Sequence, residues 1–144
     1  MPIAYINIRL SVHATEDREK VKKAIHNLLP EDHVEDVELK QTNLKGYYNN
    51  PIVLFETRIK DAGFIRAFIE KLSRSLSEID KEEVYAESKL FVDKKNLYLR
   101  LDKQAAFKGE FKLKKADPIH IRIHFSKKGE STIIRICREL GLMA

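Results

Sequence analysis

Two histidines four residues apart, His120 and His124, are the first side chains whose types and spacing suggest chemistry. On a helix this spacing would let both imidazoles bind one metal ion. The neighbouring residues alternate instead between apolar and polar types, which predicts a β-strand. Two strand residues at positions i and i+4 lie too far apart to bind the same ion, so we expect no metal site here.

The one cysteine of the chain, Cys137, offers little for catalysis. It lies on the apolar side of a predicted helix, where a thiol usually packs as a small hydrophobic group. A single cysteine also excludes an intramolecular disulfide and a zinc site built from cysteines. The sequence has no glycine-rich phosphate loop, nucleophile-elbow motif or zinc-protease motif. We therefore expect a protein that is not an enzyme and that uses no cofactor or metal.

Segment 98–107 has the side chains of an RNA-binding site. Its apolar alternation stops at Asp102, and Lys103 and Gln104 then introduce a polar turn. Arg100, Lys103 and Gln104 can donate hydrogen bonds to phosphate and 2′-hydroxyl oxygens, which are the groups that an A-form RNA helix exposes. A corner in which Arg100 and Asp102 pair with their neighbours is the structural alternative.

A second candidate contact is the segment 46–52, which contains Tyr47, Tyr48 and Asn49. Asparagine tolerates unusual backbone angles and Pro51 fixes its own, so the segment predicts a turn. Exposed tyrosine and asparagine side chains on such a loop could stack on a base or contact the RNA backbone. A rigid turn with its tyrosines packed inside the protein is the alternative.

The elements that must position these side chains follow from the periodicity of the apolar residues. Alternation and β-branched or aromatic runs predict strands at about 3–12, 34–39, 52–59, 97–101, 107–113 and 119–125. Helical spacing predicts a helix that ends before Pro30, one over 64–76, a weaker one over 80–91 and a last one over 131–140. The predicted N-caps are Thr15, Asp61, Asp80, and Ser131 or Thr132.

The three predicted strands of the last third share one polar face. Their polar positions hold Tyr98, Arg100, Lys108, Lys112, Lys114, His120, Arg122 and His124. Hairpin-joined strands with helices between them predict an α+β fold, in which an antiparallel or mixed sheet has its helices packed on one face. We expect residues 1–144 to form one such domain with a basic C-terminal third, 94–144.

The charge of the chain follows the same division. The formal net charge is +5, but residues 1–93 hold 14 basic and 17 acidic side chains, whereas residues 94–144 hold 13 and 5. Positive charge gathered in one region favours a polyanion, because each neutralised phosphate releases counterions. A solvated basic face without a partner is the alternative. No apolar run approaches the ~18 residues of a membrane span and the start lacks a signal-peptide pattern, so we expect a cytoplasmic protein without membrane contact.

Three segments resemble an archaeal family of small proteins described as RNA-binding, exosome-associated subunits. They are 13–17 with the following helix to Pro30, then 46–52, then 97–106. The last segment is the most specific, since ten consecutive residues match the family pattern. In the middle segment the family usually has a histidine at the position of Tyr47 and a glycine at the position of Asn49. The resemblance covers residues 3–125.

The resemblance implies RNA binding, a link to RNA processing or degradation, and exosome or ribosome components as partners. It also implies an α+β fold similar to the ribosomal protein that holds the smallest ribosomal RNA and to double-stranded-RNA-binding domains. It supplies no catalytic residues.

Our sequence hypothesis is a non-enzymatic RNA-binding protein. The expected contacts are Tyr98, Arg100, Lys103, Gln104, Lys108, Lys112, Lys114 and Arg122, with loop contacts from Tyr47, Tyr48 and Asn49. The alternatives are an assembly protein whose basic face binds an acidic protein partner, a ribosome-associated factor, and a nuclease that lacks a recognisable metal cluster. A homodimer formed through sheet edges or through the last helix is compatible with RNA binding and with the assembly role.

Overall fold

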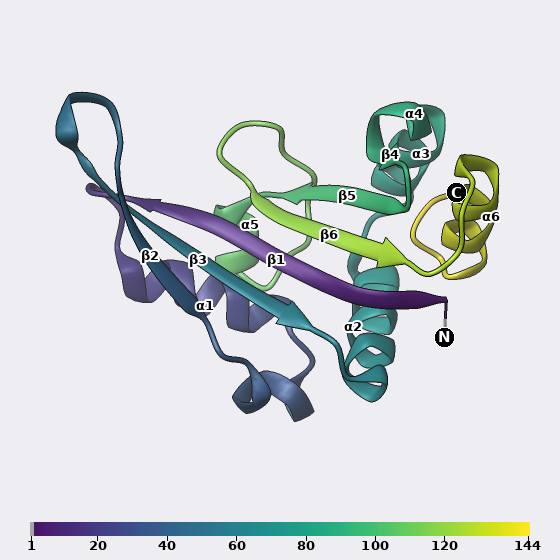
Figure 1. The fold of residues 1–144 in the computed structure, drawn as a ribbon, viewed down its shortest axis with the longest axis horizontal. Coiled ribbons are helices and arrows are strands. Elements are labelled where there is room, and N and C mark those ends of the chain that lie inside the picture. Colours follow the sequence, from purple (N-terminus) through teal and green to yellow (C-terminus); the bar gives the residue numbers. More distant parts are fainter. Residues whose placement is uncertain (1) are drawn as a thin grey trace.

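A computed structural model of the chain describes residues 2–144, except for the side chain of Tyr47. Six strands form one sheet in the order β2-β3-β1-β6-β5-β4, and every neighbouring pair is antiparallel (Figure 1). The strands are β1 (Ile3–His13), β2 (Lys40–Lys45), β3 (Pro51–Ile59), β4 (Val92–Asp93), β5 (Asn96–Leu101) and β6 (Ile119–Phe125). This arrangement confirms the predicted α+β fold class.

The helices lie on one side of the sheet and at one of its ends. They are α1 (Arg18–Leu28), α2 (Ala62–Ser75), α3 (Glu78–Ala86), α4 (Ser88–Phe91), α5 (Lys103–Phe107) and α6 (Glu130–Glu139), with short 3₁₀ turns η1 (Glu31–Asp36) and η2 (Tyr47–Asn49). Figure 1 shows α1, α2 and α5 behind the strands, whereas α3, α4 and α6 gather near β4. None of the helices in the described residues is long and apolar enough to span a bilayer.

The core forms between the sheet and these helices because the central strands are amphipathic. In β1, Ile6, Ile8 and Leu10 are at most 1% exposed, while Asn7 and Arg9 point to the opposite face. The buried strand residues join the apolar faces of the helices in one hydrophobic cluster. Each fully buried side chain of this size contributes roughly 1.5–3 kcal/mol, so the alternation fixes which face of the sheet the helices cover.

The helix starts agree with the predicted caps only in part. Asp61 is the N-cap of α2, as predicted, and its carboxylate accepts a hydrogen bond from the Phe64 amide at 2.9 Å. The helix α1 is capped by Asp17 instead of Thr15, and α3 is capped by Ser77 instead of Asp80. Asp80 lies in the first turn of α3, where its carboxylate accepts from the Leu113 amide at 3.3 Å. The last helix begins at Glu130 after Gly129, ahead of the predicted Ser131 or Thr132.

The predicted strand at 107–113 is wrong. Residues Lys103–Phe107 form α5 instead, and the segment after it is a loop with one antiparallel bridge, Leu101 to Leu113. The Asp102 carboxylate caps α5 by accepting from the Gln104 amide at 3.0 Å. Contacts from a distant helix complete it, since the Asn27 side-chain amide donates to the Ala106 and Phe107 carbonyls, each at 3.0 Å.

The predicted strand at 34–39 is also misplaced. This region starts as the 3₁₀ turn η1, and the strand β2 follows only at Lys40–Lys45. The apolar residues Val34, Val37 and Leu39 pack partly against the core from outside the sheet. β2 itself is an edge strand that is exposed on both faces, so its sequence carries no apolar alternation.

Candidate nucleic-acid interface

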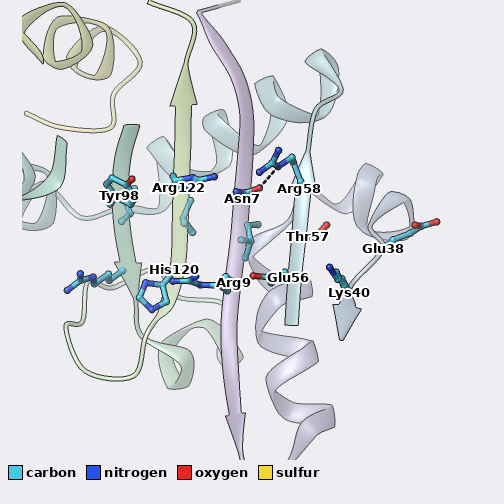
Figure 2. Close-up of a pocket in the computed structure, with 14 residues that line it drawn as sticks. Asn7, Arg9, Glu38, Lys40, Glu56, Thr57, Arg58, Tyr98, His120 and Arg122 are labelled. Atoms are coloured by element: carbon cyan, nitrogen blue, oxygen red, sulfur yellow. Dashed lines mark hydrogen bonds between the residues drawn. The ribbon is translucent and has the colours of Figure 1, made fainter. Parts of the chain in front are cut away.

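The face of the sheet opposite the helices is polar and hollowed. It contains a groove of about 640 Å³ whose lining comes from β1, β3, β5, β6 and the start of β2 (Figure 2). We call this side the open face. Its outward residues are Tyr5, Asn7, Arg9, Lys40, Glu56, Arg58, Asn96, Tyr98, Arg100, His120, Arg122 and His124. Five side chains of the groove lining are arginine or lysine, and two, Glu38 and Glu56, are carboxylates, so the groove carries net positive charge.

Strand pairing arranges these side chains in rows that run across the strands. One row, which we call the cationic row, consists of Lys40, Glu56, Arg9, His120, Arg100 and Lys114. Lys114 extends it because its amide donates to the Arg100 carbonyl at 2.9 Å, beside the bridge from Leu101 to Leu113. Figure 2 shows His120, Arg9, Glu56 and Lys40 in line. With about 4.8 Å between strands, the row spans about 24 Å.

The side chains in the middle of the cationic row are unengaged. Among the described residues, the side chains of Arg9, His120 and Arg100 make no hydrogen bond, ion pair or ring contact. Arg9 and Arg100 are also exposed. Their guanidinium groups therefore have donors that are not satisfied within this part of the chain and are available to a ligand.

A second row, Arg58, Asn7, Arg122 and Tyr98, is held largely by internal contacts. Arg58 Nε donates to Asn7 Oδ1 at 2.8 Å, and its guanidinium lies 4.1 Å from the centre of the Tyr5 ring. Arg122 Nη2 donates to the Tyr5 hydroxyl at 3.1 Å, while the buried Arg122 Nε has no partner among the described atoms. These contacts fix two guanidinium groups in place on the floor of the groove.

Tyr5 belongs to a third row with His124 and Asn96. The Tyr5 and His124 rings stack with their centres 4.6 Å apart, and His124 Nδ1 lies 2.8 Å from Asn96 Oδ1. One neighbour of the Tyr5 ring is thus an imidazole and another is the Arg58 guanidinium. Tyr98 differs, because its ring contacts no other ring or cation among the described residues.

The two histidines of the open face are held in the neutral form. Partial burial lowers the pKa of His120, and the positive charges of Arg9 and Arg100 lower it further. Burial is also the main cause of a lowered pKa at His124, followed by Lys95 and Arg122. Near neutral pH the charge of this face therefore comes from its guanidinium and ammonium groups.

The structure separates the sequence-predicted contacts into two groups. Tyr98, Arg100 and Arg122 line the groove of the open face. Lys114 continues the cationic row, and its ammonium lies 3.7 Å from an Asp102 carboxylate oxygen. Lys112 lies two residues before Lys114, and its ammonium is 3.2 Å from a carboxylate oxygen of Glu110.

The other three predicted contacts belong to α5 and the turn that follows it. Gln104 and Lys108 are exposed, but α5 packs against α1 on the helical side of the sheet. Lys108 therefore does not share the polar face with Tyr98 and Arg122, because the strand that was expected to place it there is absent from the described structure.

Lys103 requires a correction, because it is buried at 7% exposure although a polar turn was expected to expose it. Its ammonium donates to the Ser11 carbonyl and lies 3.3 Å from Glu16 Oε1 and 3.0 Å from Asp117 Oδ2. His13, Glu16 and Asp117 bring three potential metal ligands within 4.8 Å of one another. The Lys103 ammonium already supplies positive charge to these carboxylates, so the cluster is an ion-paired link between β1, α5 and the loop that carries Asp117.

The loop candidates lie away from the groove lining. Tyr48 and Asn49 form part of η2 in the β2–β3 hairpin, with positive φ values of 56° and 60°. Tyr48 is 94% exposed, which contradicts the alternative in which it packs inside the protein. Tyr47 has a side chain outside the described residues, so its predicted contact is not placed.

Sequence reasoning missed the part of the open face that comes from the acidic two-thirds of the chain. Arg9, Lys40 and Arg58 line the groove, yet all three precede residue 94. The alternation of Asn7 and Arg9 with apolar neighbours assigned them to a polar strand face. Only the strand order β3-β1-β6-β5 shows that this face is shared with Arg100 and Arg122.

A family model described as RNA binding matches residues 5–125. The chain belongs to this family. The relative RNA-binding protein PAB1135 of Pyrococcus abyssi is 39% identical over 140 residues, which cover 93% of this chain and 90% of that protein. Its name describes an RNA-binding protein and not an enzyme.

Solved structures of archaeal proteins support the same membership. Protein AF2318 of Archaeoglobus fulgidus, described as a DUF54 family protein, is 31% identical with a TM-score of 0.82, over 96% of this chain and 99% of that chain. Mth689 of Methanothermobacter thermautotrophicus, also a DUF54 protein, is 28% identical with a TM-score of 0.79, over 96% and 97% of the two chains. These two proteins therefore share the fold of this chain across nearly its whole length.

Proposed function

We propose that this protein binds RNA on the open face of its sheet. The observation that carries the proposal is the cationic row, in which Arg9, His120 and Arg100 lie side by side without partners among the described residues. An uncompensated row of donors across a groove suits a polyanion, because neutralising each phosphate releases counterions. Membership of a family described as RNA binding supports RNA as that polyanion.

In this proposal, the contacts come from both halves of the chain. Arg9, Arg100 and Lys114 contact phosphates, and Lys112 extends the basic surface beyond them. Arg122 supports the floor of the groove, and Tyr98 offers a ring to a base or ribose. Lys103 has no part in it because its ammonium is buried in ion pairs. Four further residues do not line the groove and remain predicted RNA contacts: Gln104, Lys108, Tyr48 and Asn49. Tyr47, whose side chain lies outside the described residues, also remains a predicted RNA contact.

The test is RNA binding by fluorescence anisotropy over a range of about 50 to 200 mM salt. Wild type is expected to bind at low salt and to weaken steeply as salt rises. The Arg9→Gln/Arg100→Gln variant is expected to bind more weakly, with a logarithmic salt slope that is smaller by about 1.4 if both arginines contact single-strand phosphates.

A matched control separates position from net charge. Arg66→Gln/Arg74→Gln removes the same two charges from exposed positions on α2, on the other side of the sheet. This control is expected to bind RNA like wild type. Equal losses in the two double variants, or no RNA binding by wild type at low salt, would overturn the proposal.

We further propose that RNA binding serves an accessory role in RNA processing or degradation in the cytoplasm, in association with the exosome. The support is the family resemblance in segments 13–30, 46–52 and 97–106. The test is a pull-down of the full chain from native lysate, with and without nuclease. Exosome components that remain after nuclease treatment would support a direct association, whereas ribosomal components would favour a ribosome-associated factor.

An acidic protein partner and a second copy of the chain remain as alternative partners for the assembly role. The last helix gives no exposed apolar stripe for a dimer, because Ile133, Ile136 and Cys137 of α6 are buried in the core. The free edges of the sheet are the remaining surface for self-association. Light scattering measures this directly, since a dimer has twice the monomer mass.

A further inference from the structure

We propose that the RNA bound by the open face is single-stranded, and that its backbone crosses the strands along the cationic row from Lys114 towards Arg9. This inference rests on the proposed RNA binding, and it adds the class of RNA and the path of the RNA backbone across the sheet. It follows from three features of the face: one row whose arginines are unengaged among the described residues, one aromatic ring beside that row without a ring or cation contact there, and the Glu56 carboxylate next to Arg9 in the row.

The number of rows with unengaged arginines indicates that the face binds one RNA backbone at a time. A duplex presents two phosphate backbones, one on either side of a groove. Among the described residues of the open face, the arginines without a hydrogen bond, ion pair or ring contact all lie in the cationic row. The guanidinium groups of Arg58 and Arg122 in the second row are already engaged with Asn7 and Tyr5. The face therefore offers guanidinium groups without internal contacts to one phosphate track, and beside it two guanidinium groups that internal contacts hold in place.

The free ring argues for unpaired bases. Tyr98 lies two residues before Arg100 on the same face of β5, so its ring stands about 7 Å from the cationic row. It is half-buried and has no ring or cation contact among the described residues, unlike Tyr5. A base can stack on such a ring only when it is not already stacked and paired inside a duplex.

The charges along the row set its limits. The strand neighbour of Arg9 on the β3 side is Glu56, whose carboxylate repels a phosphate. On the other side, Arg100 is followed by Lys114 at the edge of the sheet. The favourable stretch therefore covers Arg9, His120, Arg100 and Lys114, three strand spacings or about 14 Å. A strand of RNA would leave the face at the Lys114 end, where Lys112 and Lys115 continue the basic surface.

The experiment compares a short unstructured RNA with a blunt duplex of the same sequence, by anisotropy and by competition. We expect the single strand to bind at least tenfold more tightly than the duplex. Tyr98→Leu is expected to weaken single-strand binding roughly 5- to 150-fold, the loss of one stacked base, without changing the salt slope. Tyr98→Phe retains the ring and is expected to restore binding.

The controls distinguish failure of this inference from failure of the proposed function. Tyr85→Leu removes a tyrosine from α3 and is expected to have no effect on RNA binding. Circular dichroism establishes that each variant folds. If wild type binds the duplex as well as the single strand, or if Tyr98→Leu binds like wild type, the inference is overturned while RNA binding stands. If wild type binds neither RNA, the proposed function itself fails.

Discussion

At the scale of single residues, His120 is the side chain whose surroundings have the clearest functional consequence. It lies between Arg9 on β1 and Arg100 on β5, with Lys103 and Asp117 also acting on its charge. Burial and the two arginines keep its pKa below the ordinary value of 6.5, and Asp117 only partly opposes them. A phosphate in the cationic row would reverse this balance, because an anion stabilises the imidazolium.

RNA affinity should therefore increase as the pH falls from about 7.5 to 5.5. Binding raises the His120 pKa, so the complex takes up a proton and acid favours it. Affinity measured against pH for wild type and His120→Asn tests this, with His26→Asn on the exposed surface of α1 as the control. Acid has the opposite effect on the stability of the free protein. Folding lowers the His120 pKa, so the contribution of His120 to the free energy of unfolding is complete above pH 6.5 and is lost as the pH falls through the pKa of the folded state. An affinity in His120→Asn that still rises to the same extent would contradict the prediction.

We expect Lys103 to stabilise the fold and not to contact RNA. Removing one partner of a fully buried ion pair costs about 3–5 kcal/mol, but Glu16 and Asp117 keep 25% and 48% of their side chains exposed. We therefore expect Lys103→Met to lower the free energy of unfolding by about 2 kcal/mol in urea titrations. RNA affinity of the folded variant should not change. Lys89→Met, at an exposed position on α4, should alter neither quantity. A variant of Lys103 that is stable but binds RNA poorly would restore its predicted contact.

At the scale of elements, the end of α6 depends on a close approach to α2. The helix ends in a Schellman motif, in which the Leu142 amide donates to the Cys137 carbonyl at 2.9 Å and the Gly141 amide donates to the Arg138 carbonyl at 3.1 Å. Gly141 has a φ of +78°, and a Cβ added there would overlap the Ser73 hydroxyl of α2. A side chain at position 141 would therefore lower stability in two ways, through the strained backbone angle and through the overlap with Ser73.

Two variants separate these costs. Gly109→Ala, at a φ of +82° with open space around it, should lose about 1 kcal/mol for the backbone alone. Gly141→Ala should lose more than this, and adding Ser73→Ala should bring the loss back towards that of Gly109→Ala. Thermal or urea unfolding measures all three. Equal losses in the two single variants would show that Ser73 turns aside without cost.

The elements that could be predicted from sequence are those whose pattern is set by the core. β1, β3, β5 and β6 each bury one face, so their alternation identified them, and the stripes of α1, α2 and α6 did the same. α5 could not be predicted, because its five residues are completed by hydrogen bonds from Asn27, far away in sequence. Two of the predicted groove contacts, Arg100 and Arg122, followed from strand parity, but their neighbour Arg9 needed the order of the strands.

At the scale of the whole molecule, the cations of the open face come from both the basic and the acidic part of the chain. The basic last third contributes Arg100, Lys114 and Arg122 to the open face, while its Lys103 and Lys108 lie with α5 on the helical side. The net-acidic first part contributes Arg9 and other cations to the groove. Each member of the cationic row comes from a different strand or loop, so no short segment of the chain carries this surface by itself.

The exposed edge of β2 has a consequence for behaviour at high protein concentration. If two copies paired their β2 strands antiparallel in the symmetric register, Lys40 of each copy would face Lys45 of the other. Like charges directly opposite each other destabilise such a pair, and lysines at an edge are a common protection against strand-by-strand association. Added salt screens this repulsion. Light scattering should therefore show edge association strengthening as salt rises, the reverse of RNA binding, so low-salt buffers should keep the protein both dispersed and ready to bind.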